Sequence, residues 1–131
     1  LEMGTQAVQS LAGTGSSSEQ NPFIALKRPH TTEDTGEVFG FSFVYSGNFL
    51  AQVEVSTYEM TRVMMGINPQ GFSWELSRDE EFQTPEVVMV YSDKGLNGMS
   101  QAYHRLYRDR LMRGKWRNHA RPIRLNNWEA T

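Results

Sequence analysis

The residues in this chain best suited to chemistry are two groups of carboxylates and one tryptophan near the end. Glu33-Asp34 and Asp79-Glu80-Glu81 are the acidic clusters. Paired carboxylates can hydrolyse a glycosidic bond with retention when they lie roughly 5–5.5 Å apart across the sugar. Neighbouring acids within one turn rarely converge in that way. Both clusters are therefore predicted to be solvated loop charges, and no catalytic residue is assigned from them.

Metal and cofactor chemistry finds equally little support. The three histidines, His30, His104 and His119, have no ligand spacing with one another or with an acid, and the chain has no cysteine. The segment Gly13-Thr14-Gly15 lacks the later glycines of a dinucleotide-binding turn and the lysine of a phosphate-binding loop. Neither a metal nor a cofactor is expected.

Trp128 is the one candidate for substrate binding. It stands beside Asn126, Asn127 and Glu129 near the end of an expected strand. An aromatic ring can stack on the C–H face of a sugar, while amide and carboxylate groups bond to its hydroxyls. A structural tryptophan buried in a polar turn fits the same residues equally well, so both interpretations stay open.

The elements that must position these residues are mainly β-strands. Large and small side chains alternate over residues 38–45, giving one large-aromatic face, and alternation resumes over residues 49–58. The intervening Ser46-Gly47-Asn48 predicts a β-hairpin. Further strands are expected at residues 23–26, 61–65, 72–76 and 86–91, while residues 1–22 are weakly patterned. This spacing of strands and turns favours an antiparallel β-sandwich.

The periodicity changes after Asp93. Apolar residues from Met99 to Leu111 recur at helical spacing, and arginines occupy the opposite face. This predicts one amphipathic helix of about four turns, with Gly114 just past its end. Residues 121–131 begin with a proline-initiated strand. The expected organisation is a sandwich over residues 1–93, a linking helix and connector over 94–120, and the start of a second, truncated domain over 121–131.

The charge is distributed unevenly along the chain. Residues 1–93 carry four Lys/Arg against thirteen Asp/Glu, a net −9, and residues 94–131 carry nine against two, a net +7. A basic nucleic-acid-binding module and a free-standing carbohydrate-binding sandwich are alternative functions. The favoured interpretation is that the two halves face each other, or that the basic part packs on another domain. No apolar run could span a membrane, and the lack of cysteine fits a cytoplasmic protein.

The last residues resemble a known family. Arg121-Pro122-Ile123, followed by Asn126-Asn127-Trp128-Glu129-Ala130-Thr131, looks like the motif that opens the catalytic barrel of family 36 glycoside hydrolases, the microbial α-galactosidases. Earlier segments resemble this family in order and cover nearly the whole chain. They are Asn21-Pro22-Phe23-Ile24-Ala25-Leu26, Gly36-Glu37-Val38-Phe39-Gly40, Tyr45-Ser46-Gly47-Asn48-Phe49, Met65-Gly66-Ile67-Asn68-Pro69, Phe72-Ser73-Trp74, Phe82-Gln83-Thr84-Pro85-Glu86 and Ser92-Asp93-Lys94-Gly95-Leu96-Asn97-Gly98-Met99-Ser100.

The resemblance implies a piece of a larger enzyme: the last part of a β-supersandwich, a linking helix and the first strand of a (β/α)₈ barrel. The whole enzyme would hydrolyse terminal α-galactosides such as melibiose and raffinose with retention. Both catalytic aspartates of the family lie on later barrel strands, so this chain alone is expected to be inactive. Trp128 matches the family's tryptophan at the galactose site.

The resemblance also has consequences for partners. An α-galactoside is the expected ligand of the whole enzyme, and neither nucleic acid nor a membrane is expected to bind. The chain should expose strand edges together with Ile123 and Leu125, which predicts a homo-oligomer formed through an edge strand or the helix at 99–111. The alternative is that the terminal strand folds back onto the chain's own sheet.

Overall fold

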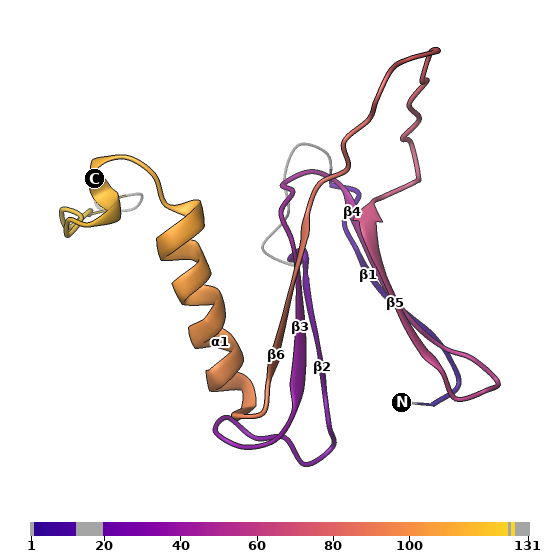
Figure 1. Cartoon of the computed structure of the whole chain (residues 1–131), viewed down its shortest axis with the longest axis horizontal. Helices are drawn as coiled ribbons and strands as arrows, with labels where there is room; N and C mark the ends of the chain where they lie inside the picture. The colour runs from indigo at the N-terminus through magenta and orange to yellow at the C-terminus, as the bar shows by residue number, and fades with distance from the viewer. Residues whose placement is uncertain (1, 13–19, 126, 128–131) are drawn as a thin grey trace.

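A computed structural model of the chain describes residues 2–12, 20–125 and 127. These residues form two three-stranded antiparallel sheets and one α-helix, which confirms the expected mainly β fold (Figure 1). The strands are β1 (Gly4–Gln9), β2 (Phe23–Lys27), β3 (Val38–Phe43), β4 (Phe49–Val55), β5 (Thr61–Ile67) and β6 (Val87–Ser92). They are followed by α1 (Gly95–Leu106), a π-helical turn at Tyr107–Leu111 and a 3-10 turn at Lys115–Arg117.

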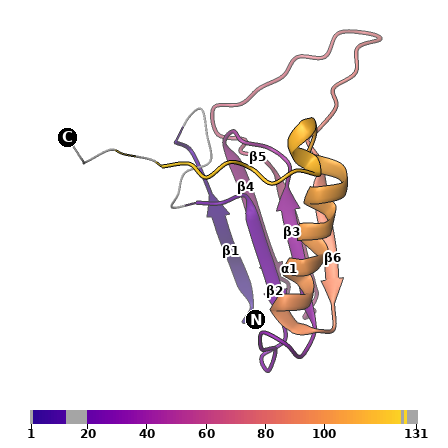
Figure 2. The ribbon, with the colours of Figure 1, turned by 90° about the vertical axis from the view of Figure 1, so that its left-hand side faces the viewer.

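The described residues form three layers, which are two sheets and the helix α1. One sheet has the order β1-β4-β5 and the other β2-β3-β6. The two sheets lie close together at the end where β3 leads into β4, and they diverge toward the other end (Figure 1). Helix α1 covers the face of the β2-β3-β6 sheet that points away from the first sheet, and it lies over β3 and β6 (Figure 2).

The contact between α1 and its sheet is made by the small face of β3. Val38, Met99 and Tyr103 are buried there, and Gly40 lies directly beneath the helix. A Cβ atom at Gly40 would lie 2.7 Å from Met99 Sδ and 2.8 Å from Tyr103 Cε2. Such distances are shorter than van der Waals contact, so any larger residue would overpack the layer. Glycine at this position allows the helix to approach the sheet closely.

A second buried cluster joins the two sheets where they converge. Phe43, at the end of β3, packs here with Phe49 and Ala51 from the beginning of β4. The large-aromatic face of β3 therefore points toward the other sheet. Because the sheets diverge, that face is buried only at Phe43, while Phe39 at the other end stays partly exposed. Alternation in β4 is confirmed, since Phe49 and Ala51 point into the cluster.

The first turn of α1 is capped by the turn between β2 and β3. The first backbone N–H groups of a helix have no partner within it, and they need acceptors from elsewhere. The acceptors here are backbone carbonyl oxygens: Gly95 N donates to Gly36 O at 2.9 Å, Leu96 N to Thr32 O at 3.1 Å and Asn97 N to Glu33 O at 2.8 Å. The turn thus fixes where the helix begins. The helix and its π turn continue to Leu111 as expected. The capping residue is Met112, and Gly114 instead precedes the 3-10 turn at Lys115–Arg117.

The predicted hairpin of residues 38–58 is wrong. Strands β3 and β4 do not pair with each other, because β3 lies between β2 and β6 while β4 lies between β1 and β5. The connection through Ser46-Gly47-Asn48 crosses from one sheet to the other. Phe43 and Phe49, on either side of it, pack across the gap between the sheets. The connection thus allows both aromatic rings to be buried in one cluster.

Three further expectations differ from the structure. Residues 4–9 form β1, which the weak pattern missed, because pairing with β4 uses backbone groups and needs no apolar side chains. The expected strand at residues 72–76 is irregular, and so are residues 121–125 of the expected terminal strand. Ile123 and Leu125 are almost fully exposed, so this segment does not fold back onto the sheet.

Candidate functional site

The two acidic clusters lie at opposite ends of the molecule. Glu33-Asp34 belongs to the turn between β2 and β3, where Asp34 Oδ1 accepts a hydrogen bond from Asn97 Nδ2 at 3.4 Å. Asp79-Glu80-Glu81 lies in the long loop between β5 and β6, which projects beyond the opposite end of the sheets (Figure 1). All these side chains are exposed, which agrees with the expectation that they are solvated charges. The two clusters cannot act on one substrate together.

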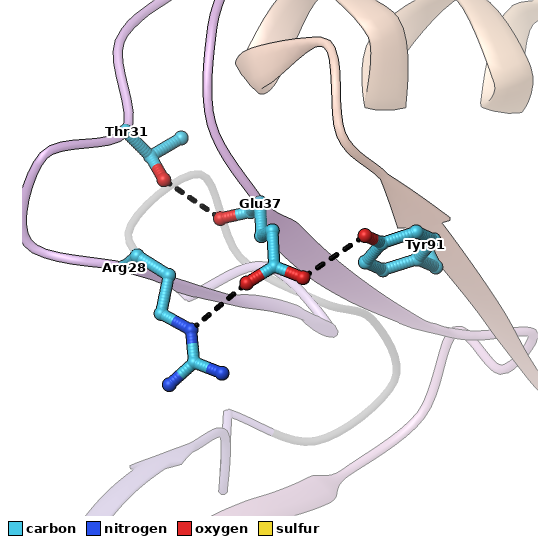
Figure 3. Close-up of polar contacts among 4 residues, drawn as sticks. All are labelled: Arg28, Thr31, Glu37 and Tyr91. Carbon is cyan, nitrogen blue, oxygen red and sulfur yellow. Dashed lines mark hydrogen bonds and ion pairs between the residues drawn. The ribbon is translucent and has the colours of Figure 1, made fainter.

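A third carboxylate, Glu37, makes the most developed polar network in the described part of the chain (Figure 3). Glu37 precedes β3 and lies on the same face as Phe39. Its Oε1 accepts a hydrogen bond from the Tyr91 hydroxyl at 3.0 Å, and its Oε2 pairs with Arg28 Nε at 3.1 Å. Its backbone carbonyl accepts a bond from Thr31 Oγ1 at 2.7 Å. The network therefore fastens the turn after β2 to the end of β6.

The network lowers the pKa of Glu37 below its ordinary value of 4.5. The largest cause is the hydrogen bond from Tyr91, followed by that from Arg28, and both favour the charged carboxylate. The same bond raises the pKa of Tyr91, because it holds the hydroxyl proton in place. Both oxygens of the ionised Glu37 carboxylate are held by partners, which suits a structural role. A general acid would instead need a pKa raised toward the working pH.

Replacement of Tyr91 by phenylalanine is expected to raise the pKa of Glu37 toward 4.5. The change removes the main cause of the shift but keeps the ring contact with Phe39, whose centroid lies 5.1 Å away. Since the pKa of Glu37 is lowered on folding, its stabilising contribution is present above pH 4.5 and is lost as the pH falls through the lowered value. NMR titration of the Glu37 carboxyl measures the shift. Arg28→Gln, which removes both a hydrogen bond and a positive charge, should raise the pKa of Glu37 as well, and an unchanged pKa in Tyr91→Phe would contradict this assignment.

Two cavities accompany these elements. A groove of about 620 Å³ lies where the sheets diverge, between Leu26 and Phe39 on one sheet and Val55 on the other. A second cavity, of about 720 Å³, lies at the base of the β5–β6 loop and is lined by Phe43 and Phe72 among others. Each has one carboxylate in its lining, Glu59 in the first and Glu86 in the second. Neither cavity therefore brings two carboxylates together for acid–base chemistry.

The loop over residues 68–86, called the arm below, carries much of the exposed aromatic surface. Phe72 and Trp74 pack against Phe82, with ring centroids 6.2 and 4.9 Å from that of Phe82. Trp74 is 61% exposed. Met60 and Met89 are also largely exposed, whereas Met99 is buried between α1 and its sheet.

No ion pair joins the acidic and basic halves of the chain among the described residues, although α1 packs on the sheet of the acidic half. The ion pairs found there, Arg28–Glu37, Arg62–Glu54 and Arg78–Asp79, all lie within the acidic half. The cations that follow Tyr103 are exposed, and His104 is exposed as well. Packing of the basic part on another domain stays a prediction.

The other features considered from the sequence are the substrate-binding Trp128, a metal site and a membrane-spanning segment. Trp128 lies outside the described residues. Within them, no three His, Asp or Glu side chains gather in a way that could hold a metal ion. None of the described helices has the length and apolar character needed to cross a bilayer.

The network around Glu37 was not predicted from the sequence. Alternation could have placed Glu37 on the face of Phe39, but its partner Tyr91 is 54 residues away.

Comparison with known proteins decides the family. The model of the glycosyl hydrolase family 36 N-terminal domain matches residues 1–77, more than half of the chain, and the melibiase model matches residues 81–131. The chain belongs to glycoside hydrolase family 36. The resemblance inferred from its motifs is thereby confirmed.

Relatives of this family 36 chain include the alpha-galactosidase AgaA of Geobacillus stearothermophilus, 63% identical over 131 residues, and alpha-galactosidase Mel36A of Lactobacillus acidophilus, 50% identical. The crystal structure of AgaA matches 99% of the chain with a TM-score of 0.94 at 62% identity. The alpha-galactosidase of Lactobacillus brevis matches 82% of the chain with a TM-score of 0.79 at 46% identity. All of this chain aligns with AgaA and Mel36A, but it spans only 18% of their length.

Proposed function

We propose that this family 36 chain works as part of a longer retaining α-galactosidase that hydrolyses terminal α-galactosides of the melibiose and raffinose type. One observation carries the proposal. The whole chain aligns at 63% identity with an alpha-galactosidase but accounts for 18% of it. Structures of AgaA variants have been solved in complex with stachyose and with raffinose, which supports this class of substrate.

In this proposal the chain supports the catalytic centre without containing it. Residues 1–93 belong to the β-supersandwich, residues 94–120 link it to the barrel, and residues 121–131 begin the barrel. The separated acidic clusters and the anchored Glu37 give no catalytic pair among the described residues. Trp128 would stack on the galactose ring in the longer protein. A cytoplasmic location and a homo-oligomeric state are further parts of the proposal.

The purified 131-residue chain is expected to show no release of nitrophenol from p-nitrophenyl α-galactoside, because retaining hydrolysis needs two opposed carboxylates. The longer gene product should hydrolyse the same substrate and release α-galactose, as shown by NMR of the first-formed anomer. Full-length AgaA and its corresponding 131-residue segment serve as a matched pair of controls. Hydrolysis by the short chain alone would refute its supporting role, and β-galactose as the first product would refute retention.

A further inference from the structure

The border between the two family models falls within the arm and does not follow the packing of the chain. The N-terminal-domain model covers residues 1–77, called the N-terminal part below, and the melibiase model covers residues 81–131, called the melibiase part. Strands β1 to β5 lie in the first part, while β6 and α1 lie in the second. Yet β6 and α1 are packed into the layers that the earlier strands form (Figure 2).

Strand β6 continues a sheet of the N-terminal part. All six residues of β6 pair with β3 in antiparallel register, beginning with Ser92 opposite Val38. Without β6, the backbone groups on this side of β3 would lose their partners, and β3 would become an open edge. The Tyr91 hydroxyl adds a side-chain hydrogen bond across the border, to Glu37 at 3.0 Å. The melibiase part thus supplies the third strand of this sheet.

Helix α1 is packed and capped by residues of the N-terminal part. Met99 and Tyr103 share a buried cluster with Val38, which is fully buried. At the start of the helix, three backbone N–H groups donate to carbonyl oxygens of the β2–β3 turn. Gly95 has a φ of +64°, and a Cβ atom there would collide with the Glu33 carbonyl oxygen. The helix is therefore fitted closely to the turn at its start and to β3 along its length.

An interface of this kind predicts rigid coupling between the two parts. Contacts between domains of one chain are ordinarily modest and polar, and the domains then move relative to one another. Here a backbone ladder and an apolar cluster both cross the border. Separating the parts would open the edge of β3 and expose the apolar face of α1 in one step. Separation therefore has the cost of opening a domain core.

We propose that the N-terminal part and the melibiase part unfold as one cooperative unit, so that the packing of α1 on β3 sets the stability of the catalytic domain in the longer protein. The clause on the catalytic domain rests on the proposed function. The coupling itself rests on contacts within this chain, because β6 and α1 have their sheet partner and their helix cap in the N-terminal part.

The alternative is a hinge beyond α1. The helix passes into the π turn at Tyr107–Leu111, and helices often bend at such turns. A flexible joint there would let the chain that follows unfold independently of β3. The packing, however, continues up to this turn. Leu106 lies against the buried cluster, and the Tyr107 ring stacks on that of Tyr103 with centroids 6.0 Å apart.

Hydrogen exchange of the 131-residue chain tests the coupling without the catalytic domain. Val38→Ala removes two buried methyl groups and should lower the protection of amides in β2, β3, β6 and α1 alike, by about five- to thirty-fold. Gly40→Ala should act on the same amides by overpacking the layer. Gly66→Ala on β5 is its matched control and should keep native protection, because a Cβ atom there meets nothing within 4 Å. Lower protection in β2 and β3 with β6 and α1 unchanged overturns the proposal.

The longer gene product extends the test to the catalytic domain. Val38→Ala should lower the urea concentration at which α-galactosidase activity is lost, and it should reduce the protection of peptides past Thr131 together with that of β3. Reduced protection in β3 with unchanged protection past Thr131 overturns the dependence of the catalytic domain on this contact. A native product without α-galactosidase activity would refute the proposed function instead, and hydrogen exchange past Thr131 would still decide the coupling.

Discussion

Replacement of Phe49 by alanine is expected to lower the free energy of unfolding by about 3–5 kcal/mol, the usual cost of removing a buried phenylalanine. Phe49 is fully buried in the cluster that joins the two sheets. Its backbone carbonyl also accepts bonds from Ser10 N at 3.0 Å and Asn68 Nδ2 at 3.3 Å. The alanine variant would leave a cavity where the sheets converge. A small domain has about 5–15 kcal/mol of stability, so much of it would be lost.

Urea unfolding followed by circular dichroism measures this change. Phe49→Leu keeps more of the buried volume and should lie between the native chain and Phe49→Ala, which keeps the test informative if the alanine variant does not fold. Tyr58→Ala is the control, because Tyr58 is 84% exposed and its loss should change stability by less than about 0.5 kcal/mol. A loss below about 1 kcal/mol for Phe49→Ala would mean that the sheets are held together elsewhere.

Tyr103 should show a comparable effect in the other core. Its ring packs edge-on against Phe23, with centroids 5.7 Å apart, and its hydroxyl donates to Val88 O at 2.9 Å. Tyr103→Ala is expected to cost about 3–5 kcal/mol and to loosen α1 from the sheet. Tyr103→Phe removes only the hydrogen bond and should cost about 0.5–1.5 kcal/mol. Equal costs for the two variants would contradict the packing role of the ring.

The hydroxyl of Tyr103 also predicts sensitivity to alkali. Burial, with a smaller effect of Tyr107, raises the pKa of Tyr103 from 10.0 to about 12. Because the folded state holds the proton more tightly, this contribution to stability is fully present below pH 10 and is lost as the pH rises toward 12. Urea unfolding at several alkaline pH values measures it, and the decline should be smaller in Tyr103→Phe. An identical decline in both proteins would assign it to other groups.

Local pattern was enough to predict most of the secondary structure. Alternation predicted β3 and β4, shorter apolar runs predicted β2, β5 and β6, and helical spacing predicted α1 with its continuation to Leu111. These signals are local, because a strand or helix that buries one face must repeat its apolar residues with a fixed period. β1 was not predicted, because all six of its residues are exposed and no apolar periodicity indicates a buried face.

The partners of the strands were not predictable in the same way. The alternating runs around Ser46-Gly47-Asn48 fit a hairpin, yet the chain crosses there between sheets. Backbone hydrogen bonds are alike in every strand, so pairing depends on which side chains can be buried together across the whole chain. Trp74 and Phe72 show the same limit, since their alternation indicates a strand but their rings pack on Phe82 in the arm.

The sequence by itself determined most of the strand and helix content, the separation of charge along the chain and the motifs of family 36. Only the tertiary structure decided that β3 and β4 belong to different sheets, that Tyr91 reaches Glu37, and that the arm and the end of α1 lie on opposite sides of the sheets. The physical reason is the distance along the chain over which each effect acts. Periodicity and composition act between near neighbours, whereas burial and ion pairing depend on residues brought together from distant parts of the chain.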